Sequence, residues 1–168
     1  MTGISSLVTA TTLPATVSDT TAETDIYSVT IPAATLVAGS VRQVTLLGRV
    51  GNQATSGALT LRAYLAGVLV ATAVLPSATS SGSASTQGFK ALFDLHVKAG
   101  GAAGTVIGLL EVLANMGGSY PPRLGGGVLS SAIDLTTDQT LAITAQWATA
   151  SASNSLVREA GRLAVVGP

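Results

Sequence analysis

The sequence predicts an all-β protein in which antiparallel strands form a sandwich of two sheets. Residues that usually cover the wet face of a helix are scarce, because the 168 residues include three glutamates and two lysines. Val, Leu, Ile and Thr instead occur in short runs that Gly, Ser, Asn and Pro separate, which is typical of strands and turns. About nine such runs at this spacing indicate a sandwich, and we expect a jelly roll.

Each expected strand is an apolar or β-branched run that ends at turn-forming residues. In chain order, the expected strands span residues 25–32, 40–50, 58–66, 68–76, 88–100, 105–115, 128–135, 139–148 and 154–166. The third and fourth meet across Ala66 and Gly67, and a two-residue connection is typical of a tight hairpin.

The run at 88–100 has the clearest alternation. Every second residue from Phe89 to Val97 is apolar, and the opposite face carries Lys90, Asp94 and His96. A period of two with this polarity predicts that one face lies in a core and the other in water.

The run at 105–115 is apolar on both faces. Val106, Leu110 and Val112 alternate with a second apolar set made up of Ile107, Leu109 and Leu113. Such a strand is either buried on both sides or located at a subunit interface. Because few charged residues are available to solvate a sandwich, we favour Ile107, Leu109 and Leu113 as interface residues, with a core position as the alternative.

Near the carboxyl end, residues 139–148 place Leu141, Ile143, Ala145 and Trp147 on one face of a strand. This alternation predicts that Trp147 anchors the core near a strand end.

The chain is the size of one domain. Residues 1–24 are rich in Ser, Thr and Ala and are expected to form an extended arm, followed by a single sandwich domain over 25–168. The first basic residue is Arg42, so we expect no secretory signal. The sequence contains no cysteine, which excludes disulfides and thiolate metal sites.

Charge and hydropathy bear on the partners of the chain. Eight basic residues balance eight acidic ones and are scattered singly, so we do not expect nucleic-acid binding. The most apolar run, Leu65 to Leu75, is too short for a membrane helix, which takes about 20 residues. Only 10% of the residues are charged and 47% are hydrophobic, whereas soluble domains have about 25% charged residues. We therefore expect copies of the chain, or a larger assembly, to cover much of the surface.

Three sets of polar residues are candidates for chemistry. Asp94 and His96 could serve as a carboxylate and a base, Asp94 and Glu111 as paired carboxylates on adjacent strands, and Asp134 and Asp138 as calcium ligands. A solvated strand face and turn formation explain these residues more simply. We expect no enzymatic activity, and no catalytic, cofactor or metal site.

Two loops stand out in composition. Residues 77–88 are small, polar and uncharged, which suits a connection at one end of the sandwich. Residues 116–127 combine five glycines with Pro121 and Pro122 and present Tyr120 and Arg123. This loop is interpreted either as a recognition loop, since Tyr and Arg are favoured in binding hot spots, or as a segment that packs on a neighbouring subunit.

The carboxyl-terminal third resembles a segment of structural proteins of tailed bacteriophages, with the pattern D-x-T-x-x-Q-T-L-x-[IL]-T-x-Q-W-x-x-A-S-x-x-N. The matching residues are Asp134, Thr136, Gln139, Thr140, Leu141, Thr144, Gln146, Trp147, Ala150, Ser151 and Asn154. An earlier stretch is similar to the pattern Y-x-x-x-I-P-A-x-x-L-x-x-G-S of those proteins, through Tyr27, Ile31, Pro32, Ala33, Leu36, Gly39 and Ser40.

The resemblance implies a virion component with a jelly-roll fold, often trimeric, that serves as a capsid decoration, head-fibre or receptor-binding domain. Residues 1–24 contain no heptad or collagen-like repeat, which favours a short protein seated directly on a shell. The expected function is that of a homotrimeric capsid decoration protein, bound to the major capsid protein or another virion protein and assembled into the virion in the bacterial cytoplasm. The alternative is a receptor- or glycan-binding domain of a tail or head fibre.

Overall fold

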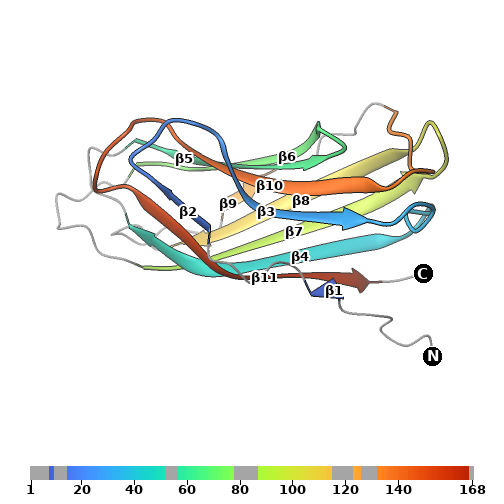
Figure 1. The fold of residues 1–168 in the computed structure, drawn as a ribbon, viewed down its shortest axis with the longest axis horizontal. Helices are drawn as coiled ribbons and strands as arrows, with labels where there is room; N and C mark the ends of the chain where they lie inside the picture. The colour runs from blue at the N-terminus through green and yellow to red at the C-terminus, as the bar shows by residue number, and fades with distance from the viewer. Residues whose placement is uncertain are drawn as a thin grey trace.

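Two antiparallel β-sheets pack face to face and make up the molecule (Figure 1). The computed structural model describes residues 8–9, 15–51, 57–77, 87–114, 123–125 and 132–166. These residues contain no helix, and so none that could cross a membrane. The predicted all-β sandwich of two antiparallel sheets is confirmed.

The two sheets differ in size. The larger sheet has seven strands, in the order β1 (Val8–Thr9), β11 (Ser155–Val166), β4 (Val41–Gly51), β7 (Gln87–Ala99), β8 (Thr105–Ala114) and β9 (Arg123–Gly125), with β2 (Ala15–Ser18) also paired to β11. The smaller sheet has four strands, in the order β3 (Thr24–Ile31), β10 (Gln139–Trp147), β5 (Leu59–Leu65) and β6 (Val68–Leu75).

The strand pairs are nested along the chain. β2 pairs with β11, β3 with β10, β4 with β7, and β5 with β6, so that each pair encloses the next. The β2 and β4 pairs lie in the larger sheet, and the β3 and β5 pairs lie in the smaller one. β8 and β9 extend the larger sheet beyond β7. Most contacts therefore join residues that are distant in sequence.

Eight of the expected strands match observed ones to within a residue or two. The hairpin between β5 and β6 turns at Ala66 and Gly67, whose φ angles of 52° and 75° are those of a primed turn. The strand expected at 128–135 is wrong in its described part, residues 132–135. There Ile133 forms one isolated bridge to Gly104, and Asp134 accepts hydrogen bonds from Thr136 in a turn.

The described part of the amino-terminal arm lies against the sandwich. Within the predicted arm at 1–24, Ala15–Ser18 forms β2 on the edge of β11, and Val17 is 1% exposed. The indole Nε1 of Trp147 donates a hydrogen bond to the Val17 carbonyl oxygen at 3.3 Å. Residues 15–24 therefore contribute to the sandwich that composition assigned to 25–168.

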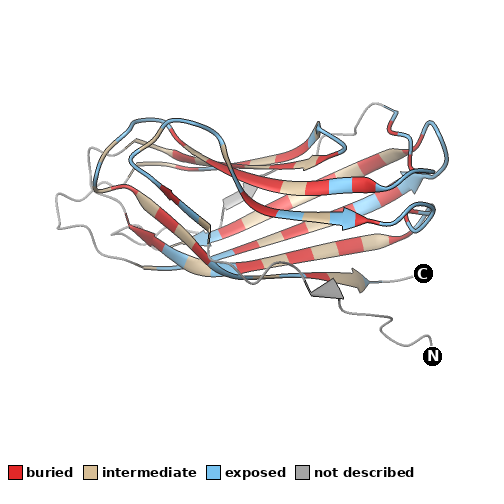
Figure 2. Ribbon diagram, in the orientation of Figure 1, coloured by how far each residue is buried: buried red, intermediate tan, exposed pale blue. Residues whose placement is uncertain are grey.

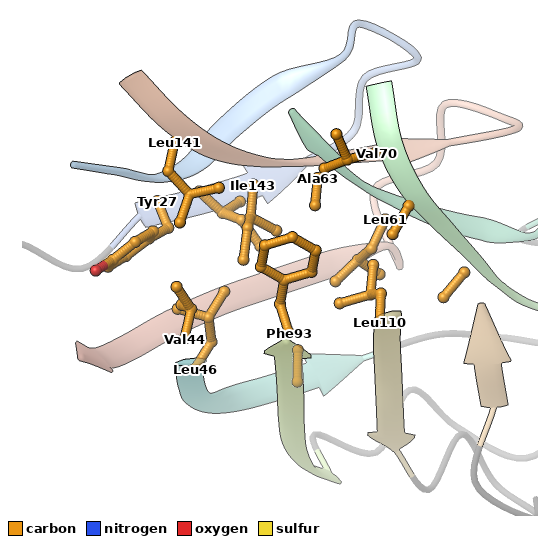
Figure 3. Packing of buried hydrophobic residues seen from close by; sticks show 14 of the residues in the cluster. Tyr27, Val44, Leu46, Leu61, Ala63, Val70, Phe93, Leu110, Leu141 and Ile143 are labelled. Carbon is orange, nitrogen blue, oxygen red and sulfur yellow. The ribbon is translucent and has the colours of Figure 1, made fainter. Parts of the chain in front are cut away.

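The core fills the space between the two sheets. Buried residues alternate with more exposed ones along β4, β7, β8 and β10 (Figure 2). Phe93 from the larger sheet projects towards Ile143 of the smaller one, among Leu61 and Leu110 (Figure 3). Each of these four side chains is fully buried, as is Trp147, which confirms its prediction as a core anchor.

Candidate interaction surface

The larger sheet has one side that points away from the smaller sheet, and we call this side the outer face. It is formed by the residues that alternate with the buried inner residues of β11, β4, β7 and β8. The strand registers place them in four rows across the sheet, which are Val166–Val41–His96–Ile107, Ala164–Gln43–Asp94–Leu109, Arg162–Thr45–Leu92–Glu111, and Ala160–Leu47–Lys90–Leu113.

Apolar side chains of the outer face are accessible to solvent. Leu47, Leu113 and Val166 are 47%, 37% and 46% exposed, and Ile107 and Leu109 are half-buried. A sheet face in water is normally polar, and clustered apolar side chains indicate a contact surface. The structure therefore places Ile107, Leu109 and Leu113 on the outer face and excludes the alternative that they are core residues.

The charged groups of the outer face differ in their partners. Asp94 Oδ1 accepts a hydrogen bond from Gln43 Nε2 at 2.9 Å. Lys90 and Arg162 belong to neither of the two ion pairs found between described residues, which are Arg49–Glu159 and Arg62–Glu23. Neither charge is therefore neutralised by an ion pair with a described acidic residue.

A β-bulge in β11 shapes the outer face beside these cations. The register between β11 and β4 shifts between Arg158 and Ala160. At the bulge the Val157 carbonyl oxygen lies over Gly48 so closely that a Cβ on Gly48 would be 1.9 Å from it. Glycine is therefore required at position 48.

Next to the bulge, the outer face is hollowed. The hollow has a volume of about 390 Å³ and is lined by Thr45, Leu47, Lys90, Ala160, Gly161 and Arg162. Leu47, Ala160 and Gly161 make part of its lining apolar, and Lys90 and Arg162 add two positive charges. This composition suits a group that carries both an apolar part and a negative charge.

The residues considered for acid–base chemistry lie on the same face. Asp94 and His96 are alternate residues of β7, and His96 lies between Val41 and Ile107 in its row. Glu111 pairs with Leu92 and is thus a diagonal neighbour of Asp94 across β7 and β8. The hollow beside the bulge is lined by other residues, so Asp94, His96 and Glu111 do not line it.

The two aspartates considered for calcium take part in loop structure. Asp134 Oδ1 accepts hydrogen bonds from the backbone N and Oγ1 of Thr136 at 2.9 and 2.5 Å, and these bonds lower the pKa of Asp134. Asp138 Oδ1 accepts a hydrogen bond from the Ala33 backbone N at 2.7 Å. Within the described ranges, no three acidic or histidine side chains gather where a metal could bind.

The proposed recognition loop falls largely outside the described residues. Tyr120 lies outside them, and Arg123 is described only as the first backbone position of β9, paired with Val112. The role of these two residues in recognition stays a prediction.

A polar cluster that was not predicted from the sequence lies on the outside of the smaller sheet. Glu23 Oε1 accepts hydrogen bonds from Tyr64 Oη at 2.8 Å and Thr144 Oγ1 at 2.5 Å, while Glu23 Oε2 lies 3.1 Å from Arg62 Nη1. Burial acts to raise the pKa of Glu23, but these two hydrogen bonds and the Arg62 charge outweigh it and lower the pKa. Gln146 Nε2 donates to the Thr21 carbonyl oxygen at 2.9 Å.

The cluster fastens the segment between β2 and β3 to the sheet. Its sequence signal is the alternation in β10, where Thr144 and Gln146 point outward while Ala145 and Trp147 point into the core. Outward polar residues on a strand are usually solvated, so only the position of Glu23 in space identifies their role.

Comparisons of the chain with protein-family models, with curated proteins and with solved structures find no match.

Proposed function

We propose that this protein is a structural component of a tailed-bacteriophage particle, a decoration protein that binds the head and stabilises it. Its outer face is buried against neighbouring subunits in the assembled particle. The family assignment rests on the two sequence patterns, and the surface role rests on the structure of the outer face. The resemblance implies a trimer, and the proposed function itself requires only that neighbouring subunits cover the outer face.

The observation that carries the proposal is the accessible apolar surface on the outer face. Leu47 and Leu113 lie in one row, on either side of Lys90, and both are more than a third exposed. Burying such side chains contributes roughly 25 cal/mol per Å² of apolar area removed from water. An assembly that covers this face is therefore favoured over the free subunit.

The strand order supports a jelly roll. A jelly roll has eight strands that form two Greek keys in two packed sheets, and capsid domains commonly have this architecture. The four nested pairs supply eight strands, with β2-β11-β4-β7 in one sheet and β3-β10-β5-β6 in the other. In this interpretation β8 and β9 are an addition at the β7 edge, and it is this addition that places Ile107, Leu109 and Leu113 on the outer face.

The residues that carry the resemblance have structural roles here. Gln139 Nε2 donates to the carbonyl oxygens of Asp134 and Thr137, and Asn154 Nδ2 donates to that of Thr149 at 2.7 Å. Such residues hold loops at the ends of strands. This agrees with a family that is defined by its architecture and by its place in a particle.

Decoration stabilises a shell by mass action. A subunit that binds the assembled shell and not its separated parts shifts the equilibrium towards the shell by RT ln(1 + [L]/Kd) per site. The mechanism requires a surface that binds and no catalytic group.

Occupancy of purified particles tests the proposal. We expect antibodies to label heads, and we expect Leu47→Lys with Leu113→Lys to lower the copy number per particle at least about tenfold, since each places a further positive charge beside Lys90. Val74→Lys is the control for the charge change, because Val74 is 50% exposed on the smaller sheet. Full occupancy by the double variant would exclude the outer face, and absence of the protein from particles would overturn the function.

A further inference from the structure

The outer face is divided evenly by the line between β4 and β7. On one side of this line lie β4 and β11, together with β1 and β2, which both pair with β11. On the other side lie β7, β8 and β9. A twofold axis along this line, parallel to the strands, would place β11 of one copy over β8 of another and β4 over β7.

The charges of the outer face are complementary under this operation. Each row faces the same row of the second copy, so Arg162 of each copy meets Glu111 of the other. Lys90 meets Leu47, and Asp94 meets Gln43, so no charge meets a like charge. A twofold axis along the rows, centred on the face, would instead bring each strand over itself, with Arg162 over Ala164 and Glu111 over Leu109, and would leave both charges without a charged partner.

The apolar residues are complementary as well. The same operation places Leu113 over Ala160, Leu109 over Ala164, and Ile107 over Val166, which pairs long side chains with small or exposed ones. Sheets that pack face to face keep their strands within about 30° of each other, so the central rows stay close to this register.

The hollow beside the β11 bulge supplies the matching cavity. Leu113 and Glu111 of the second copy lie opposite its lining, which is apolar at Leu47 and Ala160 and positive at Lys90 and Arg162. Leu113 therefore provides the apolar part, and Glu111 provides the negative charge, that suit this lining.

We propose that the occupant of the outer face is a second copy of this chain, packed about a twofold axis between β4 and β7, with Glu111 and Leu113 of each copy in the hollow of the other. The inference rests on the proposed function only in its premise that the outer face is buried in an assembly. It replaces the trimer with a twofold pair at this surface.

The area of the pairing is that of a weak, transient interface. Four strands about 4.8 Å apart and four rows about 6.8 Å apart cover roughly 500 Å² per copy. Specific interfaces bury about 800 Å² per partner, and weak ones less. We therefore expect a dimer that dissociates on dilution, at concentrations of about 1–100 µM.

Mass measurements on the full chain test the inference. Sedimentation and native mass spectrometry over this range should give a dimer, and Arg162→Glu or Glu111→Arg alone should raise its dissociation constant at least about tenfold, because like charges then meet twice. An equimolar mixture of the two variants should form a heterodimer, in which both contacts pair opposite charges, and the doubly substituted chain should recover the homodimer.

The controls separate association from folding and dimer from trimer. Asp25→Arg, an exposed acid on the smaller sheet, makes the same charge change as Glu111→Arg and should leave the dimer intact. Each variant should keep the circular dichroism of the parent, and also its melting temperature at concentrations low enough for the parent to be monomeric. A ring with an odd number of subunits cannot place the two variants alternately. A trimer, or an equimolar mixture of Arg162→Glu and Glu111→Arg that stays monomeric, would therefore overturn the pairing.

Self-association of the chain and its occupancy of heads can be measured separately. A chain that is monomeric at about 100 µM but occupies heads fully through Leu47 and Leu113 overturns the twofold pair and leaves the function in place. A dimer that is absent from particles overturns the function and leaves the pair.

Discussion

The indole Nε1 of Trp147, at the end of β10, donates a hydrogen bond to the carbonyl oxygen of Val17 in β2, 3.3 Å away. Both residues are almost wholly buried, and they are 130 positions apart in the chain. This contact joins the smaller sheet to the first strand of the nested set. It makes the segment before β3 part of the fold.

Two truncations test this role. Removing residues 1–24 deletes β2 with Val17, leaves the Trp147 N–H without its partner and opens the core, so we expect the free energy of unfolding to fall by at least about 3 kcal/mol. Removing residues 1–14 keeps β2 and is the control, with a loss of less than about 1 kcal/mol. Urea denaturation followed by circular dichroism at one protein concentration measures both, and equal losses would refute a structural role for β2.

The bulge in β11 requires glycine at position 48. Gly48→Ala should lower the free energy of unfolding by about 3 kcal/mol or prevent folding, because its Cβ would meet the Val157 carbonyl oxygen at 1.9 Å. Gly88→Ala is a matched control in the neighbouring strand, since its Cβ would meet nothing within 4 Å, and it should be neutral or stabilise by up to about 1 kcal/mol. Thermal melting distinguishes the two, and a stable Gly48→Ala variant would contradict the close approach.

The hydroxyl of Tyr27 is buried, and it has no hydrogen-bond partner among the described residues. Tyr27→Phe should therefore leave the free energy of unfolding at pH 7 unchanged or raise it by about 1 kcal/mol. Tyr64→Phe is the comparison, because it removes a donor to Glu23 and should lower stability by less than about 1 kcal/mol. A clear loss of stability in Tyr27→Phe would show that its hydroxyl is bonded.

The buried hydroxyl of Tyr27 should also lower the free energy of unfolding in alkali. Burial raises its pKa from 10.0 to about 12, against the opposing charge of Arg158. The unfolded chain loses this proton first as the pH rises, so the stabilisation is complete below pH 10 and is lost between pH 10 and about 12. Urea midpoints measured across this range should fall less steeply in Tyr27→Phe than in the parent, and equal slopes would count against the buried hydroxyl.

Protonation of Glu23 should lower the free energy of unfolding in acid. Its pKa is lowered below 4.5, so its contribution is present above that pH and disappears as the pH falls through the folded-state value. Glu23→Gln should lose less than about 1 kcal/mol at pH 7, because the cluster is partly exposed, and should show a shallower decline below pH 4.5. Thr144→Val removes one of the donors and should lie between this variant and the parent. Acid titrations that superimpose for all three would contradict the role of the cluster.

Period-two patterns predicted most of the strands because the hydrophobic effect acts on each residue locally. The inward residues of β7 and β10 were identified in this way, including Phe93 and Trp147. The same pattern could not tell which apolar face of β8 is outward. That choice depends on β6, which packs against β8 and whose Val70 backbone lies near Gly108 on the inner side.

The sequence by itself determined that the chain forms strands, which faces of most strands are apolar, and that few charges are available to solvate its surface. Only the tertiary structure decided that β2 belongs to the sandwich, that the bulge in β11 lies over Gly48, and that Lys90, Arg162 and Leu47 meet around one hollow. The reason is that strand pairing joins residues far apart in sequence. Register and bulges depend on the partner strand, which no local pattern identifies.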